Sequence, residues 1–428
     1  MLNKKLVSCF DYAIIACLCL LIFCLPFAKA GVETFVWIGF FLWLTKRTLG
    51  YRAESFLGIF PETELNKALG VFIAVNLTAT IFTVNSALSL RGFFGKEIKF
   101  MAIYFMLVET INDKRRLKII LMTIIASAIL IIADALVQYY RGIDFLRGYP
   151  SGRLTASFIS ANGFAAWLLI IIFLFLGMLA NSGIIGSKMK VTVSFLTVML
   201  LICLIATYAR GAWFGFLAGV FIVFCYIIRN ASFKMKTFYL FIIVSLLGGI
   251  IFLPQPLKTK FAAVGKIDFK IGLTLSDRIT STVKMNEGSV LFRIKLWQEA
   301  LGIIRDFPLT GSGLNTYSVV APHYKIIEGG GVYPHNSFLQ MAAETGVMGV
   351  MAFFGFLLKF FQVGISQFKQ KNNYLIPGLL LGISAFLIHA FFDTHLYSLQ
   401  LAVFFWFMVG LTMAVTRLDI KEALQKGI

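Results

Sequence analysis

Long apolar segments, separated by short polar connections, make up most of this chain. Segments of about 20 mostly apolar residues match the hydrocarbon core of a bilayer and predict transmembrane helices. About twelve such segments lie near residues 11–26, 30–45, 66–84, 92–110, 117–138, 158–180, 191–208, 212–228, 237–253, 344–362, 374–392 and 396–416. The pattern therefore predicts an all-α integral membrane protein with about 12 transmembrane helices.

One long hydrophilic stretch interrupts this pattern, between about Pro254 and Tyr333. Loops of this length without structure of their own are uncommon, and they are usually functional or disordered. The stretch divides the chain into residues 1–253 with the first nine expected spans, a loop in 254–336 that contains helices, residues 337–416 with the last three spans, and a tail in 417–428.

The charge pattern sets the expected orientation. The formal net charge is +19, which in a soluble protein would suggest nucleic acid as a partner, but 59% of the residues are hydrophobic and 14% are charged. Basic residues gather in alternate connections, for example 114–118 and 369–371, which the positive-inside rule places in the cytoplasm. Both termini are then cytoplasmic, the large loop is periplasmic, and the basic residues contact membrane lipids rather than nucleic acid.

The loop contains one segment with a clear helical pattern, from Ser289 to Phe307. Its apolar residues recur at helical spacing, and Pro308 ends it. Arg293 lies on the apolar face in the first turn, where the helix dipole disfavours a cation. The side chain either extends to water or to a structural carboxylate, or it belongs to an anion site, because its rigid donor fork suits phosphate.

His335 lies between Pro334 and Asn336, where a helix that leads into the tenth span is expected to begin. A helix N-terminus favours a neutral imidazole and attracts anions, and a neutral histidine is what a general base requires. A capping or interfacial histidine is the alternative. Arg153 and Arg210 lie at the outer ends of two spans, where they either anchor the membrane interface or join Arg293 around a pyrophosphate.

His389, Asp393 and His395 form a compact group between the last two expected spans. His389 and Asp393 are four residues apart, so we expect them to share a helix face. Two imidazoles and one carboxylate favour a hydrogen-bonded cluster that orients loop residues over a metal site.

Several short motifs occur in a fixed order along the chain. They are Gly152-Arg153 with Asn162, Arg210-Gly211-Ala212, Arg293 with Trp297-Gln298-Glu299-Ala300-Leu301, the stretch 308–315, and Pro334-His335-Asn336-Ser337-Phe338-Leu339-Gln340 with Glu344-Thr345-Gly346. In these motifs and their sidedness the chain resembles the O-antigen ligase and O-antigen polymerase family, most specifically over about residues 290–350.

The resemblance implies a glycosyltransferase of lipopolysaccharide biosynthesis with a GT-C-like fold, in the bacterial inner membrane with its active site facing the periplasm. The donor would be O-antigen on undecaprenyl pyrophosphate, the acceptor a sugar hydroxyl of lipid A–core, and neither a nucleotide nor a metal cofactor is expected. His335 matches the family's catalytic histidine, Arg210 and Arg293 match its essential arginines, and Asp393 lies where members often carry an acidic residue. Arg153 and Asn336 complete the expected substrate-binding set, and transfer would invert the anomeric configuration.

Two alternatives remain at this stage. A polymerase of the same family would use the same donor and a second lipid-linked repeat unit as acceptor; the ligase is preferred because one large loop precedes the tenth span and a histidine ends it. A transporter of the same glycan lipid would place charged groups at the bilayer midplane. Most charges lie at span ends instead, apart from Asp134.

Overall fold

The computed structural model describes residues 4–50, 60–181, 183–230, 288–326, 333–371 and 373–425. These residues form helices and connecting loops, with no β-strand among them. The helices are α1 (Lys4–Cys24), α2 (Lys29–Gly50), α3 (Asn66–Ile81), α4 (Ser86–Gly92), the π-helix η2 (Phe93–Glu97), α5 (Ile98–Thr110), α6 (Lys114–Arg141), α7 (Ala161–Ala180), α8 (Ser187–Ala206), α9 (Arg210–Asn230), α13 (Gly288–Asp306), α14 (Tyr317–Val320), the 3-10 helix η4 (Ala321–Tyr324), α15 (Ser337–Lys371), α16 (Leu375–His389), the 3-10 helix η5 (His395–Tyr397) and α17 (Leu399–Gln425).

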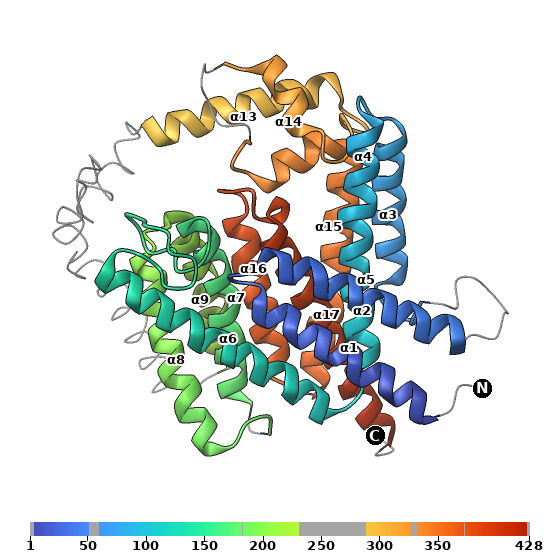
Figure 1. Ribbon diagram of the computed structural model, residues 1–428, viewed down its shortest axis with the longest axis vertical. Coiled ribbons are helices and arrows are strands. Elements are labelled where there is room, and N and C mark those ends of the chain that lie inside the picture. The colour runs from blue at the N-terminus through green and yellow to red at the C-terminus, as the bar shows by residue number, and fades with distance from the viewer. Residues whose placement is uncertain are drawn as a thin grey trace.

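The connections between helices gather at two opposite ends of the bundle (Figure 1). One end, here the terminal end, holds both chain termini and the turns at 111–113 and 183–186. There Lys46 bonds to Asp11 at 2.6 Å and to Glu109 at 2.7 Å, while Arg116 bonds to Asp11 at 3.2 Å. The other end, here the site end, holds the loop 142–160, the turn 207–209, α13, α14 and the segment 390–398.

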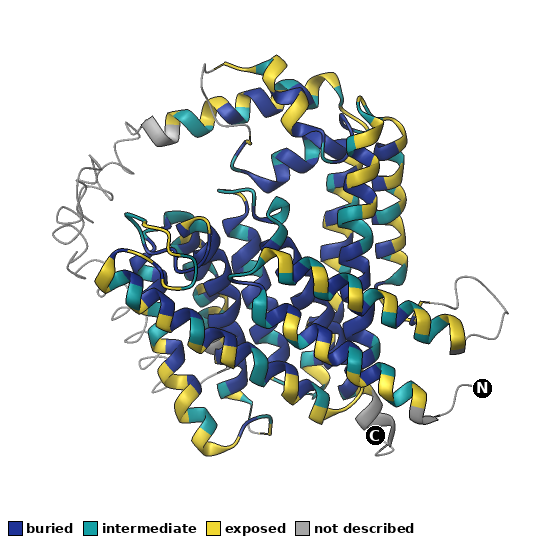
Figure 2. Ribbon diagram, in the orientation of Figure 1, coloured by how far each residue is buried: buried dark blue, intermediate teal, exposed yellow. Residues whose placement is uncertain are grey.

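The outer surface of the bundle is apolar along whole faces of α8 and α15. Figure 2 marks exposed positions along α8 in yellow. The exposed residues recur every three or four positions, as expected for one face of a helix. They are Val191, Phe195, Val198 and Ile202 on α8, and Val347, Met351, Phe354 and Leu358 on α15. Continuous apolar faces of this kind are stable in lipid but not in water, so the chain is a multi-pass membrane protein.

Six of the described helices are long and apolar enough to cross a membrane: Leu6–Cys24, Lys114–Arg141, Ala161–Ala180, Ser187–Ala206, Ser337–Lys371 and Leu399–Ile420. Shorter apolar helices cover Asn66–Ile81, Arg210–Tyr226 and Leu375–His389. The expected span at 92–110 is divided in the structure among the last residue of α4, the π-helix η2 and α5. The expected span at 237–253 lies outside the described residues, so the number of 12 spans stays a prediction.

Glycines allow α16 to pack closely between α7 and α9. A Cβ on Gly378 would lie 2.7 Å from the carbonyl oxygen of Phe173, and one on Gly382 would lie 3.0 Å from Ile170. On the opposite side, a Cβ on Gly215 of α9 would lie 2.5 Å from the carbonyl oxygen of Ala385. Small residues at such spacing bring helix backbones together in membranes. The tight fit fixes the position of the end of α16, and with it His389.

α15 is broken near its start by a loop that inserts into it. At Gly346 the backbone has φ 65° and ψ −173°, a conformation essentially restricted to glycine. The backbone N–H groups of Ser312 and Gly313 donate to the carbonyls of Ala343 and Glu344, both at 2.9 Å, and Val347 N–H donates to Pro308 O at 2.9 Å. The loop 308–313 therefore satisfies the backbone groups that the break in α15 leaves without helical partners.

We expect Gly346→Ala to destabilise the protein strongly. A Cβ at this position would lie 2.0 Å from the carbonyl oxygen of Leu309, in addition to the strain of the backbone conformation. The two effects should cost about 3 kcal/mol or more. Thermal unfolding in detergent measures the loss. Gly355→Ala, on the same helix with no atom within 4 Å of the added carbon, is the matched control and should be neutral or slightly stabilising. Equal melting temperatures for the two variants would contradict the role of the break.

Candidate functional site

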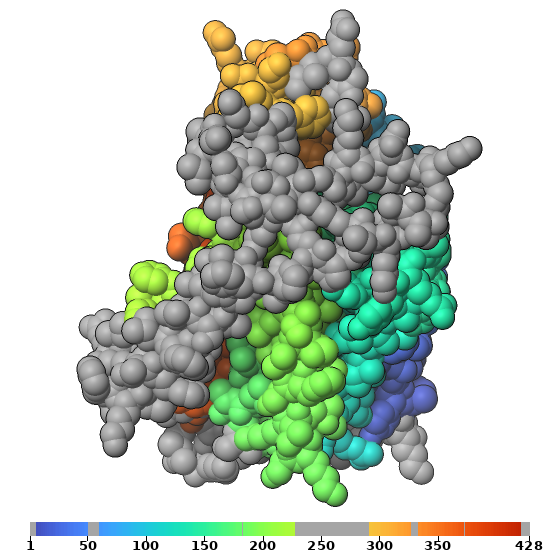
Figure 3. All heavy atoms as spheres, turned by 90° about the vertical axis from the view of Figure 1, so that its left-hand side faces the viewer, coloured from blue at the N-terminus to red at the C-terminus, as the bar shows by residue number. Residues whose placement is uncertain are grey.

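The N-termini of three helices meet at the site end. Asn162 in the first turn of α7 and Ser337 at the start of α15 both bond to Asp393, and Arg210 is the first residue of α9. A helix N-terminus carries a partial positive charge and unsatisfied backbone N–H groups, so it attracts anions. α13 lies at the top of the molecule, beyond these helices, in both Figure 1 and Figure 3.

His335 and Asp393 form the central pair of the site. His335 Nδ1 lies 3.0 Å from Asp393 Oδ1, and the side chains are 41% and 14% exposed, respectively. Because an ionised carboxylate can only accept, Nδ1 carries the proton in this pair and Nε2 keeps a free lone pair. Nε2 makes no hydrogen bond to the described residues. The pair is therefore built like a base whose ring orientation and tautomer are set by a carboxylate.

Asp393 is held on its other side by the amide of Asn162. Asn162 Nδ2 donates to Asp393 Oδ2 at 2.7 Å, and Arg153 donates to Asn162 Oδ1 at 3.3 Å. Arg153 Nε also donates to the carbonyl oxygen of Thr207 at 2.9 Å. These bonds connect the loop 142–160, α7, the turn before α9 and the segment after α16, so the orientation of His335 depends on four parts of the chain.

The surroundings of Asp393 keep its carboxyl group ionised. Burial alone would raise the pKa of Asp393, but the hydrogen bond with His335, the two neighbouring imidazoles and the amide of Asn162 together hold that pKa well below its usual range. Asp393 is thus a fixed negative charge at any pH at which the protein is studied, and it does not itself carry protons during a reaction.

Arg293 lies within electrostatic range both of this carboxylate and of Arg210. Burial lowers the pKa of Arg293, the charge of Asp393 raises it, and the charge of Arg210 lowers it again. Guanidinium groups remain cationic after such shifts, because their ordinary pKa exceeds 12. With Arg153, they place three guanidinium groups around the His335–Asp393 pair.

The positions of His389 and His395 relative to Asp393 differ from those expected from the sequence. α16 ends at His389, and the chain turns at once, so Asp393 does not share a helix face with His389 as the four-residue spacing suggested. Instead His395 Nε2 lies 3.1 Å from His389 Nδ1, and both rings are buried. Burial lowers the pKa of His395 to about 4, so it is neutral at physiological pH. The expected cluster is therefore present only in part: the two histidines bond to each other, while the Asp393 side chain pairs with His335 and Asn162.

Asn336 and Ser337 fix the segment that carries His335. The side-chain oxygen of Asn336 accepts from the backbone N–H groups of Phe338 and Leu339, at 2.9 and 3.1 Å, and so caps α15. Ser337 Oγ donates to the carbonyl oxygen of Asp393 at 2.9 Å. His335 itself has a φ of +48°, a left-handed conformation that non-glycine residues adopt at a cost, and Tyr208 beside Arg210 has a φ of +52°.

The structure thus brings five of the sequence-predicted residues into one region, namely Arg153, Arg210, Arg293, His335 and Asp393. Asn336, the sixth, lies next to His335, with its side-chain oxygen engaged in the cap. Sequence reasoning did not assign a role to Asn162, Thr207 or Ser337. For Asn162 a signal existed, because it lies in one of the shared motifs; Thr207 contributes only its backbone carbonyl.

The arrangement combines an anion-binding surface with a base. Three guanidinium groups and the helix N-termini can hold two linked phosphates, and a base with a free Nε2 stands beside them. Comparison with known proteins is consistent with this chemistry: residues 195–354 match the family model described as O-Antigen ligase. A search of curated proteins found no match.

Inorganic pyrophosphate should stabilise the purified protein in detergent. At a free concentration ten times its Kd, binding to the folded state adds about 1.4 kcal/mol, which appears as a higher melting temperature. Arg293→Ala and Arg210→Ala should lose most of this shift. Arg305→Ala, on the exposed side of the same helix α13 as Arg293, should keep it. If all variants shift equally, the arginines around Asp393 do not form the anion site.

Proposed function

Because residues 195–354 match the O-antigen ligase family, we propose that the chain transfers O-antigen polysaccharide from undecaprenyl pyrophosphate to a sugar hydroxyl of lipid A–core. The match supports an enzyme of the ligase or glycosyltransferase type in lipopolysaccharide biosynthesis. The observation that carries the specific proposal is the ionised Asp393, which orients His335 as a base while three arginines surround the pair.

In this reaction the pyrophosphate lies among Arg153, Arg210 and Arg293, and the polyprenyl chain extends into the bilayer. The acceptor hydroxyl oxygen attacks the anomeric carbon and forms the new glycosidic bond. The bond from that carbon to the pyrophosphate oxygen breaks, and the negative charge that develops there is stabilised by the guanidinium groups. The hydroxyl proton passes to Nε2 of His335. Attack opposite to the leaving group inverts the anomeric configuration.

The donor supplies the energy for this step in its pyrophosphate bond, so no nucleotide, metal ion or covalent intermediate is required. This fits a site on the periplasmic face of the bacterial inner membrane, where ATP is absent. The proposed orientation follows from the basic connections of the terminal end, such as 114–118, which the positive-inside rule places in the cytoplasm.

A carrier for the same lipid is less well supported. Asp134, the charged residue that suggested a transport pathway, lies near the site end of α6. Its Oδ1 accepts from the backbone N–H groups of Phe145 and Leu146, at 2.8 and 3.2 Å. The carboxylate therefore secures the loop 142–160, which also carries Arg153, and this explains its position without a transported substrate.

His335→Ala should abolish transfer. Removal of the base removes the proton acceptor, a contribution typically worth about 10²- to 10⁴-fold in rate. The assay is the protein reconstituted with lipid-linked glycan and lipid A–core, scored for covalent transfer without nucleotide or metal. Pyrophosphate binding by this variant should be retained. His323→Ala, an exposed histidine of the same loop, is the control. Full activity of His335→Ala would remove the base assignment. Glycan joined to lipid A–core supports the ligase; longer lipid-linked glycan would identify a polymerase instead.

Asp393→Asn should lower kcat by about 10²- to 10⁴-fold and leave the donor KM nearly unchanged. The amide can donate a hydrogen bond to Nδ1 of His335 and so stabilise the tautomer that leaves the proton on Nε2, where it blocks base catalysis. The same assay measures the effect. A normal kcat in Asp393→Asn would show that Asp393 has only a structural role.

A further inference from the structure

A cavity of about 220 Å³ lies beside the His335–Asp393 pair. Its wall includes Tyr333, two residues before His335, and Thr394, the residue after Asp393. The wall also includes Gln340 from the first turn of α15 and Ser318 from α14. None of the three arginines of the site lines it. The cavity is therefore separate from the arginines, and chain neighbours of His335 and Asp393, rather than these two residues themselves, form part of its wall.

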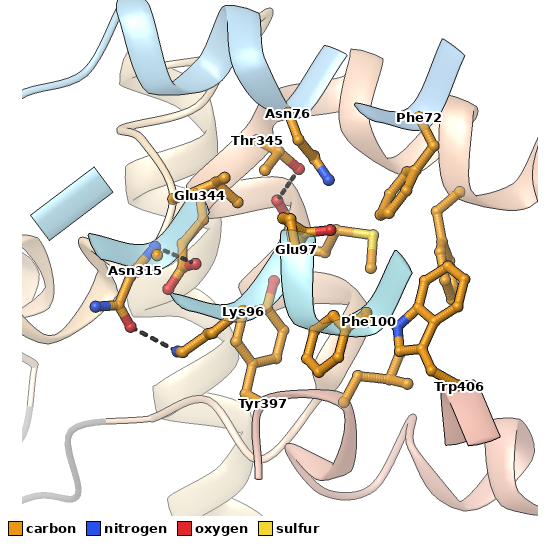
Figure 4. Close-up of a pocket in the computed structure, with 15 residues that line it drawn as sticks. Phe72, Asn76, Lys96, Glu97, Phe100, Asn315, Glu344, Thr345, Tyr397 and Trp406 are labelled. Carbon is orange, nitrogen blue, oxygen red and sulfur yellow. Dashed lines mark hydrogen bonds between the residues drawn. The ribbon is translucent and has the colours of Figure 1, made fainter. Parts of the chain in front are cut away.

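The floor of the cavity is a connected set of polar side chains; Figure 4 shows three of them, Lys96, Asn315 and Glu344, where they line a smaller neighbouring cavity. Lys96 Nζ donates to Asn315 Oδ1 at 2.6 Å, and the backbone N–H of Asn315 donates to Glu344 Oε2 at 2.8 Å. Gln340 Nε2 donates to Glu344 Oε1 at 3.2 Å. Asn315 adopts a φ of +62°, a left-handed conformation that costs a non-glycine residue energy. Its hydrogen bonds in this floor hold it in that conformation. Both oxygens of Glu344 accept from N–H donors, which is the pairing of an ionised carboxylate, so its charge offsets that of Lys96.

The π-helix η2 contributes to this floor. Lys96 and Glu97 are its last two residues, and both line a second cavity of about 60 Å³, which shares Lys96, Asn315 and Glu344 with the first. Single π-turns inside an α-helical run occur often at functional sites, because they change the direction of neighbouring side chains. The interruption of the expected span at 92–110 thus coincides with this cavity wall.

A buried polar atom in the wall of the larger cavity lacks a hydrogen-bond partner within the described part of the chain. This atom is Gln340 Oε1, on a side chain that is 2% exposed. In the smaller cavity the Asn76 amide and the Glu97 carboxyl face each other, as Figure 4 shows, so they interact mainly with one another. Buried polar atoms are normally paired, so an unpaired one in a cavity wall indicates water or a hydrogen-bonding ligand there.

From these observations we propose that the 220 Å³ cavity binds the acceptor sugar ring, and that this ring is uncharged. The proposal rests on the transferase function argued above. Inversion requires the acceptor and the leaving pyrophosphate on opposite sides of the anomeric carbon. The arginines hold the pyrophosphate, so a hydroxylated ring in the cavity presents its hydroxyl to His335 from the other side. Hydroxyl groups, amide groups and the faces of tyrosine rings are suited to bind a sugar. The balanced charges of Lys96 and Glu344 disfavour a ring that carries a carboxylate or a phosphate.

The size of the cavity limits what it can hold. Pockets for drug-sized ligands enclose about 300–1,000 Å³, so a cavity of 220 Å³ is too small for an oligosaccharide. At about 30 Å³ per water molecule it has room for about seven waters, comparable to one pyranose ring. The rest of the acceptor must then extend outward past Ser318 and Tyr333, both of which are exposed.

Ser318→Trp tests this assignment in the reconstituted system, because the new side chain fills the cavity from an exposed position. The KM for lipid A–core should rise by about tenfold or more, while the donor KM and pyrophosphate binding stay within about twofold of wild type. Val319→Trp is the matched control: its side chain is also exposed, at 42%, and does not line the cavity. If Ser318→Trp folds poorly, Tyr333→Ala replaces it in the test. This variant removes an exposed wall residue and should also raise the KM for lipid A–core.

The outcomes separate this proposal from the function on which it rests. If wild type and Val319→Trp transfer no glycan to any acceptor, the transferase function itself is wrong. If they transfer glycan, and Ser318→Trp and Tyr333→Ala do so with an unchanged acceptor KM, the cavity does not bind the acceptor. A rise in the donor KM alone would assign the cavity to the donor sugar and overturn the proposal.

The charge of the ring is tested with two soluble probes. Methyl glucoside should inhibit wild-type transfer competitively against lipid A–core, and methyl glucuronoside, which differs by a carboxylate, should inhibit much less. Ser318→Trp should lose inhibition by methyl glucoside. Equal or stronger inhibition by the glucuronoside would overturn the neutral-ring assignment.

Discussion

The carboxylate of Asp393 is the group on which the site depends. It accepts from Asn162 of α7 and pairs with His335 at the start of α15, while its backbone carbonyl accepts from Ser337. A buried ionised carboxylate is costly unless all its oxygens are paired, so removal of any partner leaves an uncompensated charge. The same bonds that stabilise Asp393 therefore hold together helices that are far apart in the sequence, and they also orient His335.

A second constraint acts on the backbone. The loop 308–313 occupies the break in α15 and so ties the end of α13 to the helix that begins at Ser337, two residues after His335. Gly311 and Gly313 have φ of +71° and +112°, and a Cβ on Gly313 would lie 1.9 Å from Thr83 Oγ1. These glycines are required by close backbone approach, so the Gly-Ser-Gly and Glu-Thr-Gly motifs serve docking of the loop rather than chemistry.

Much of this arrangement was predictable from the sequence, because local patterns determine it. The amphipathic helix expected at Ser289–Phe307 is α13, at Gly288–Asp306, and the helix expected to begin near Asn336 starts at Ser337. The three arginines and His335 were identifiable because they break apolar patterns or lie at helix ends. The bonds of Asp393 were not identifiable, since its partner Asn162 is 231 residues away. Nor did any local signal show that α16 ends at His389 rather than continuing to Asp393.

The cavity floor is a further part of the structure that could not be predicted from the sequence. Lys96, Asn315 and Glu344 come from three elements, and in the sequence each has an ordinary explanation as an interfacial or loop residue. Their connection emerges only in three dimensions, where Lys96 reaches Asn315 and Asn315 reaches Glu344. A lysine and a glutamate joined through Asn315 leave little net charge, whereas Arg293 lies near a second cation, Arg210, and one carboxylate, Asp393. Such an asymmetry of charge across a single base is what a transfer reaction requires when its leaving group is an anion and its nucleophile is a neutral hydroxyl.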